Sequence, residues 1–200
     1  MGKTVWVCLA VLVLSACSMM STETATPIPT KTPIPDTNRE EERVYAALIE
    51  AHYPSDLLVI MENTQTDVLE LASDEIYMHV EGSLQHLSAD TLSDFQTRND
   101  SSYPLKASMI LGSRYILLSV KDKQELFQIN QSGWDVFYNR YPEAPGIITL
   151  SRVGFNARMD QALVYLGIQS HWLAGSGSFF LLDKVDGEWV IDQQVMTWVS

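Results

Sequence analysis

Cysteine is nearly missing from this sequence, and long hydrophobic runs are missing too. Its 200 residues include only two cysteines, Cys8 and Cys17. The chain beyond residue 17 therefore has no thiol for an internal disulfide, for a zinc site or for nucleophilic catalysis. The longest apolar run covers residues 5–14, whereas a helix needs about 20 apolar residues to span a membrane. We therefore expect no transmembrane helix.

Positive charge is also scarce. The chain has 13 lysine and arginine residues against 25 aspartate and glutamate residues, which gives a formal net charge of −12. Such an acidic chain lacks the basic surface that binds nucleic acid, and anionic lipid head groups would repel it. We expect no nucleic-acid partner. Solubility explains the acidic excess, and attraction of cationic ligands or divalent metals is the alternative.

The N-terminus has the order of a secretory signal, with Lys3, then the apolar run, then small residues. The stretch Leu14-Ser15-Ala16-Cys17 resembles the bacterial lipobox. The resemblance implies that residues 1–16 are a signal peptide and that Cys17 becomes the first residue, carrying diacylglycerol and a further acyl chain such as palmitate. Two acyl chains anchor a protein stably without a membrane-spanning helix. We expect a lipid-anchored protein on the extracytoplasmic face of the cell membrane, with the bilayer as its partner.

A tether and one globular domain are expected to follow. Residues 17–37 contain four of the eight prolines, and alternating proline favours an extended polyproline II spacer. Asn38 followed by Glu41 is typical of a capping box, which predicts a helix start. We therefore assign residues 38–200 to a single domain.

The fold class expected for this domain is α+β. Helical spacing is typical of the first half, and from Gly146 four strand-like runs follow, with Asp186-Gly187 as a hairpin signal. This order predicts N-terminal helices packed on one face of a C-terminal antiparallel β-meander, with Phe179–Leu182 covered on both sides. The last two strands are similar in style to the cone-shaped sheets of cystatin or NTF2-like domains. Further expected elements are strands at 57–61 and 114–120, and helices that start at Ser88 or Asp90, at Lys121 and at Ser132.

Residues 134–165 carry a distinctive pattern. It contains Trp-x-x-Phe-Tyr, a Tyr-Pro turn, Leu-Ser-Arg-Val-Gly-Phe-Asn and Gln-Ala-Leu-Val-Tyr, and Trp-Val-Ser follows at 198–200. In this pattern the chain resembles a group of uncharacterised bacterial lipoproteins, over roughly Ala46 to Ser200. The resemblance implies a lipoprotein and brings no activity with it.

Motifs for catalysis or metal binding are missing from the sequence. It has no Gly-x-Ser-x-Gly elbow, and its four histidines lack the spacing of metal ligands. We therefore assign no catalytic residue, no metal ligand and no cofactor.

Three polar residues are tentative ligand-binding candidates. Arg152 falls within an apolar run that we expect to be a strand, where a covered guanidinium needs a carboxylate partner, a ligand anion or exposure. Asn156 and Gln161 flank an expected turn, where they either shape the backbone or reach a ligand.

Aromatic residues supply two further candidates. Trp134, Tyr138, Tyr141 and Trp172 could form a platform for sugar or peptide, although helical spacing favours core positions for the first three. Trp172 follows His171 at an expected strand end, so we assign both to a tentative ligand site.

We therefore expect a non-catalytic binding or accessory module of the cell envelope, with an envelope protein, peptide or glycan as ligand and the oligomeric state left open. A hydrolase that uses carboxylate or histidine groups at the sheet mouth is the alternative. A structural spacer or stress-response lipoprotein is a third possibility.

Overall fold

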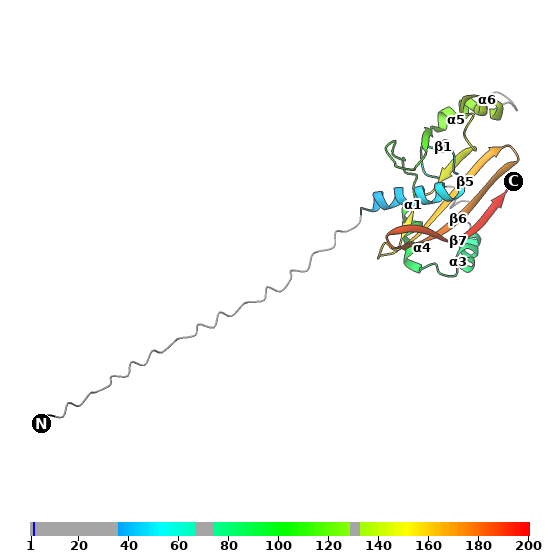
Figure 1. Cartoon of the computed structure of the whole chain (residues 1–200). Coiled ribbons are helices and arrows are strands. Elements are labelled where there is room, and N and C mark those ends of the chain that lie inside the picture. Colours follow the sequence, from blue (N-terminus) through cyan, green and yellow to red (C-terminus); the bar gives the residue numbers. More distant parts are fainter. Residues whose placement is uncertain (1, 3–35, 67–73, 129–132) are drawn as a thin grey trace. The chain divides into compact units, whose positions relative to one another are not determined.

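A computed structural model describes Gly2 and residues 36–66, 74–128 and 133–200 of the chain (Figure 1). The expectations on Cys17, on most of the tether and on Ser132 lie outside these residues. The described part of the chain from Asp36 onward belongs to one compact unit. Within that part, no helix combines the length and apolarity that crossing a membrane requires.

The domain is built on one mixed seven-stranded sheet with the order β2-β1-β3-β5-β6-β7, and β4 also pairs with β5. β1 runs parallel to both β2 and β3, while the other pairs are antiparallel. The strands are β1 (Leu57–Met61), β2 (Arg114–Leu118), β3 (Ile147–Leu150), β4 (Gly154–Phe155), β5 (Gln161–His171), β6 (Ala174–Val185) and β7 (Glu188–Val199). The described helices are α1 (Thr37–His52), α3 (Asp74–Ser83), α4 (Ala89–Arg98), α5 (Val120–Phe127) and α6 (Gly133–Arg140).

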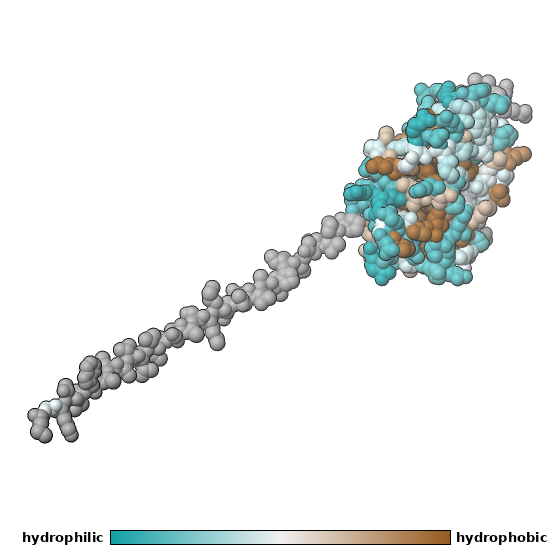
Figure 2. All heavy atoms as spheres, viewed as in Figure 1, coloured by the Kyte–Doolittle hydropathy of each residue, from teal (hydrophilic) through white to brown (hydrophobic). Residues whose placement is uncertain are grey.

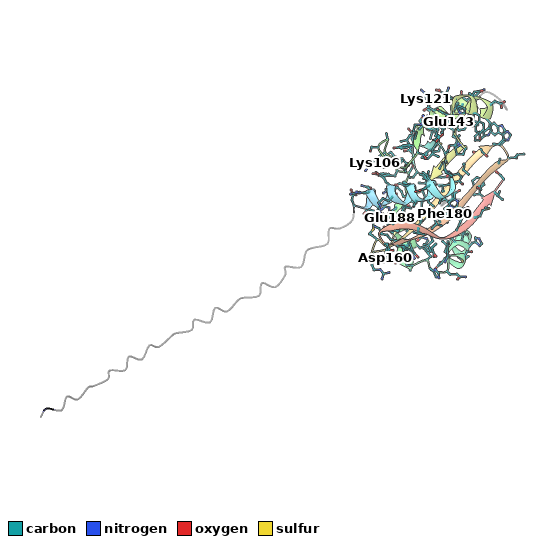
Figure 3. All side chains as sticks on the ribbon, viewed as in Figure 1. Lys106, Lys121, Glu143, Asp160, Phe180 and Glu188 are labelled. Atoms are coloured by element: carbon teal, nitrogen blue, oxygen red, sulfur yellow. The ribbon has the colours of Figure 1, made fainter. Side chains whose placement is uncertain are left out.

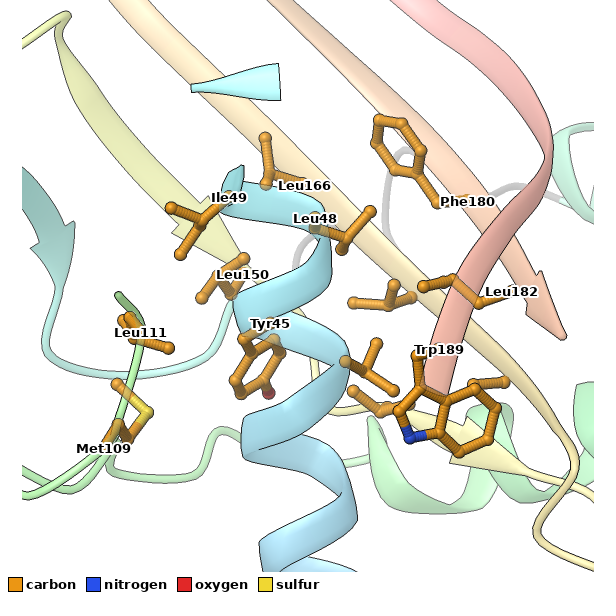
Figure 4. Packing of buried hydrophobic residues seen from close by; sticks show 14 of the residues in the cluster. Tyr45, Leu48, Ile49, Met109, Leu111, Leu150, Leu166, Phe180, Leu182 and Trp189 are labelled. Carbon is orange, nitrogen blue, oxygen red and sulfur yellow. The ribbon is translucent and has the colours of Figure 1, made fainter. Parts of the chain in front are cut away.

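Helix α1 covers one face of the sheet. Its buried side chains include Tyr45, Leu48 and Ile49, which pack against alternate residues of the strands, such as Leu166 and Phe180. Figure 4 shows these side chains pointing from the helix toward the strands. Successive residues of a strand point to opposite faces of the sheet. The strand residues that alternate with Leu166 and Phe180 therefore point away from α1.

Two separate groups of helices cover the opposite face of the sheet. Leu163 and Phe179 pack under α4 with Phe95, while Val59 and Ile147 belong to a third cluster with residues of α5 and α6. The fold is therefore mixed, with helices in the N-terminal half as expected. The prediction that the helices pack on one face alone was wrong, because a sheet with apolar residues in both phases needs cover on both sides.

The central position of Phe179–Leu182 is confirmed. β6 lies between β5 and β7, and each of these four residues is at most 2% exposed. Asp186 and Gly187 both have positive φ, 50° and 89°, as a tight hairpin turn requires. The four expected runs form the antiparallel meander as β3, β5, β6 and β7. The strands β1 and β2 lie where they were expected, but their parallel pairing was not foreseen.

The helix starts are set by side-chain caps. α1 begins one residue before Asn38, because the Asp36 carboxylate accepts a hydrogen bond from the Asn38 amide at 3.1 Å. The capping box predicted at Asn38 was therefore wrong. Ser88 caps α4, which confirms one of the two expected starts. Ser119 caps α5, which begins at Val120, one residue before the expected start at Lys121.

Candidate functional site

Arg152 lies in the link between β3 and β4, outside the strand in which the sequence places it. Its amide donates to Asn99 Oδ1 at 2.7 Å and so leaves the strand ladder. Its guanidinium forms a two-pronged ion pair with Glu41 of α1, with Nε–Oε1 at 2.9 Å and Nη2–Oε2 at 3.0 Å. Of the alternatives left open for Arg152, the structure shows a carboxylate partner.

Glu41 is the centre of a buried charge network. Arg98 of α4 also donates to it at 2.9 Å, and the side chains of both arginines are only 14% exposed. The carboxylate further accepts from the hydroxyl of Tyr45 at 3.1 Å and from the amide of Val153 at 2.9 Å. Burial would lower the pKa of Arg152, but the hydrogen bond and charge of Glu41 raise it above its ordinary value. This network joins α1, α4 and the β3–β4 link.

Asn156 and Gln161 are committed to the turn between β4 and β5. Asn156 Oδ1 accepts from the amides of Asp160 and Gln161 at 3.0 and 3.2 Å, and its Nδ2 donates to Asp160 Oδ1 at 2.6 Å. The amide oxygen of Gln161 accepts from Ser88 N and Thr91 Oγ1. Both side chains therefore hold the turn and the start of α4 together, and their ligand contact stays a prediction.

His171 and Trp172 belong to an aromatic group at the end of β5. The ring of His171 stacks near Trp134 at 6.4 Å, with the two planes 24° apart. Trp172 is 44% exposed and meets Phe127 edge-on at 5.5 Å. The hydroxyl of Tyr138 donates to the carbonyl of Ser170 at 2.8 Å and ties α6 to the same strand end.

A cavity of about 350 Å³ opens beside this aromatic group. α5, α6 and β5 supply its walls, and Trp172 closes one side. Its lining residues are Val120, Lys123, Gln124, Phe127, Trp134, Gln169 and Trp172. We call it the aromatic pocket. Its volume falls near the lower end of the range of about 300–1,000 Å³ that is common for small-molecule sites.

Two residues that line the aromatic pocket, Trp134 and Lys123, have hydrogen-bond donors with no partner among the described residues. The indole N–H of Trp134 is buried and has no acceptor in the described part of the chain. Lys123 is partly buried, and desolvation lowers the pKa of its ammonium below the ordinary 10.5. Among residues 36–66, 74–128 and 133–200, its ammonium has neither an ion pair nor a hydrogen bond. Buried unpaired polar groups are rare in proteins and point to a bound ligand or a functional role.

Sequence reasoning found part of this pocket. It assigned Trp172 to a tentative ligand site and favoured a core position for Trp134, which could also form a platform. Trp134 does both, since it is 3% exposed and still lines the cavity. Lys123 and Phe127 were missed. Their helix was expected, but no local pattern in the sequence indicates that Lys123 has no carboxylate partner in the part of the chain that the structure describes.

A second cavity, of about 660 Å³, lies where the C-terminal end of α1 meets the loops before β1 and β2. Three carboxylates, those of Glu50, Asp56 and Glu143, are among its lining residues. Glu143 already pairs with Arg114 at 2.9 Å. In the part of the chain that the structure describes, no group of three histidine, cysteine or acidic side chains is arranged to hold a metal ion.

Comparison of the chain with protein-family models, with curated proteins and with solved structures finds no match. The geometry of the domain therefore carries the functional argument.

Proposed function

We propose that this protein is a lipid-anchored, extracytoplasmic lipoprotein whose domain is a binding or accessory module of the cell envelope. The aromatic pocket is the observation that supports the binding role. The proposed anchor is acylated Cys17, which the lipobox pattern of residues 14–17 supports. The expected likeness of the sheet to cystatin or NTF2-like cones stays a prediction, and the proposal does not depend on it.

The contrast between two sets of polar groups supports this assignment. Arg152, Asn156 and Gln161 make hydrogen bonds or ion pairs inside the domain, so a ligand would have to displace them. Lys123 and Trp134 face no such competition within the described residues. Concave, mostly apolar sites with a few convergent polar groups are the usual form of a ligand pocket.

The anchor is tested by labelling cells with a radioactive palmitate. Cys17→Ser should abolish the label and release the protein from the membrane fraction. Cys8→Ser is the matched control, because it removes the other cysteine of the chain and should leave both label and fractionation unchanged. A Cys17→Ser protein that still carries palmitate and stays membrane-bound would rule out the anchor.

Binding is tested on the full-length chain in detergent by equilibrium dialysis. The probes share one flat apolar body and differ in charge: indole-3-propionate, indole-3-propionamide and tryptamine. At least one should bind, and Trp172→Ala should weaken that binding roughly two- to tenfold because one aromatic contact is lost. Leu173→Ala is the control, since Leu173 is 83% exposed and does not line the pocket.

Two results would count against the binding role. One is that none of the three probes binds, which would favour the structural spacer. The other is that the purified chain hydrolyses generic ester, peptide or glycoside substrates, which would favour the envelope hydrolase.

A further inference from the structure

We propose that the aromatic pocket takes an anionic small molecule, one with a flat apolar body and a carboxylate or similar acidic end. This inference rests on the proposed binding function, because it names the ligand class of the same pocket. Three features of the described residues support it: the shape of the apolar walls, a lysine without an ion pair and an indole N–H without an acceptor.

The walls fit a flat apolar body. Phe127 meets Trp134 at 4.9 Å and 71°, and it meets Trp172 at 5.5 Å and 81°. The two tryptophan rings are themselves 83° apart. These rings form a corner, in which an inserted aromatic ring can stack on one wall and meet another edge-on. Both are the arrangements that aromatic pairs prefer.

The charge in the pocket fits an acidic end. On α5, Lys121 pairs with Glu125 at 3.8 Å, and the Asp122 carboxylate accepts from Ser119 Oγ at 2.6 Å. Lys123 has no such partner among the described residues, and the cavity that it lines includes no aspartate or glutamate there. A partly buried cation without a counter-charge is costly, and a ligand anion would relieve that cost.

The indole N–H of Trp134 supplies a second donor. Trp134 is 3% exposed, and its N–H has no acceptor in the described residues. Two of the other described tryptophans, Trp189 and Trp198, donate their indole N–H to Glu40 at 2.8 Å and to the Tyr165 hydroxyl at 2.7 Å. A carboxylate accepts on two oxygens, so it can receive hydrogen bonds from an ammonium and an indole together.

A cationic ligand is the competing choice, because aromatic cages bind ammonium groups. Lys123 argues against it, since two cations in one small apolar cavity repel each other. The net charge of −12 does not alter this choice, because salt screens exposed charges beyond about 8 Å at physiological ionic strength. The positive charge of Lys123 therefore favours a ligand with negative charge.

The experiment follows the indole N–H signals by NMR in the full-length chain, labelled with ¹⁵N-tryptophan and held in detergent. Indole-3-propionate should shift the Trp134 signal downfield in a saturable way, and Trp134→Phe assigns that signal by its loss. The signals of Trp189 and Trp198 should stay in place, because their N–H groups already donate inside the protein. Indole-3-propionamide and tryptamine should bind at least tenfold more weakly.

Lys123→Gln and Lys121→Gln form a matched pair on the same helix. Lys121 lies on the surface of α5, labelled in Figure 3, with a side chain that is 84% exposed. Lys123→Gln should lower the affinity for indole-3-propionate roughly tenfold or more, the loss expected when a hydrogen bond to a charged group is removed. It should change the affinity of the neutral amide less than twofold. Lys121→Gln should leave both affinities unchanged.

The possible failures are distinguishable. If the amide or tryptamine binds as tightly as the acid, or if Lys123→Gln binds the acid normally, the anionic ligand class is wrong while the binding role stands. If none of the probes moves the Trp134 signal or binds in dialysis, both the ligand class and the proposed function fail. Unchanged Trp189 and Trp198 signals show in each variant that the domain is folded.

Discussion

At the scale of single residues, two neighbouring carboxylates hold the first helix to the rest of the domain. Glu41 pairs with Arg152 and Arg98, and Glu40 pairs with Lys184 of β6 at 2.6 Å. Glu40 also accepts from the indole N–H of Trp189 at 2.8 Å. The side chains of Glu40 and Glu41 are only 11% and 7% exposed. Removing the partners of either carboxylate would therefore leave a buried charge uncompensated and lower the free energy of unfolding.

Replacing Glu41 by glutamine should destabilise the domain strongly. The change keeps the size of the side chain and leaves Arg98 and Arg152 without a counter-charge. Loss of one partner from a buried ion pair costs about 3–5 kcal/mol of unfolding free energy, which urea denaturation would measure. Glu42→Gln is the control, since the structure shows no ion pair for Glu42 among the described residues, and it should cost less than about 0.5 kcal/mol.

Glu40 should make stability depend on acid pH. Burial alone would raise the pKa of its carboxyl, but hydrogen bonds from Lys184, Trp189 and Arg43 outweigh it, so the pKa lies below its ordinary 4.5. The unfolded state then binds the proton more tightly than the folded state. The stability that Glu40 contributes is complete above its unfolded pKa, and it is lost as the pH falls through its folded pKa.

Glu40→Gln tests this sign. At pH 7 we expect the variant to be less stable than the parent by about 2 kcal/mol, the usual range for hydrogen bonds to a charged group. The gap should narrow as the pH is lowered through about 4, because the parent loses the same interactions by protonation. A gap that stays constant from pH 7 to pH 3 would contradict the assignment.

At the scale of elements, α4 packs directly against the backbone of β4 at Gly154. A Cβ added at Gly154 would overlap the backbone of Phe95, which is fully buried in α4. The amide of Phe155 also donates to the Asp94 carboxylate at 2.8 Å. Glycine at position 154 therefore allows the helix and the strand to touch.

Gly154→Ala should push α4 away from the sheet and destabilise the domain by about 1–3 kcal/mol, as overpacking does. Gly82→Ala is the contrasting control, because Gly82 is exposed on α3 and nothing lies within 4 Å of an added Cβ. In a helix, alanine is favoured over glycine by about 1 kcal/mol. The two variants should therefore move the urea midpoint in opposite directions, and a shared direction would show that the close approach is unimportant.

Local patterns explain which of these elements could be predicted. The hairpin at Asp186-Gly187 and the doubly covered strand at Phe179–Leu182 are encoded in adjacent residues, and both are present. Pairing between distant elements is not encoded locally. The partner of Arg152, Glu41, lies 111 positions away in the sequence. The parallel pairing joins β1 and β2, and the described helices α3 and α4 lie between these strands in the sequence. The lack of partners for Lys123 and Trp134 among the described residues is likewise not encoded in adjacent sequence.

At the scale of the whole molecule, the described domain combines a packed apolar core with a few exposed apolar residues around its rim. On the face in Figure 2, hydrophilic residues predominate over α5 and α6, and hydrophobic ones show where β6 and β7 lie. Leu173 and Val199, 83% and 71% exposed, add apolar surface at the ends of β5 and β7. Against this background, the partly buried Lys123 breaks the rule that charges are paired or solvated, and such exceptions are characteristic of functional sites.

Removing the charge of Lys123 should therefore stabilise the domain and weaken ligand binding at the same time. Lys123→Met keeps the length of the side chain and removes a cation that burial disfavours. It should raise the unfolding free energy of the free protein, because the cost of an unpaired charge disappears. It should also weaken binding of an acidic ligand, because the counter-charge disappears with it. Lys121→Met, on the exposed side of the same helix, should change neither quantity.

The most direct test is to measure both quantities on the Lys123→Met protein, with urea denaturation for the unfolding free energy and dialysis for indole-3-propionate. We expect a more stable protein that binds the acid at least roughly tenfold more weakly. A variant that is less stable than the parent, or one that binds indole-3-propionate as well as the parent, would show that Lys123 is not the counter-charge of an acidic ligand.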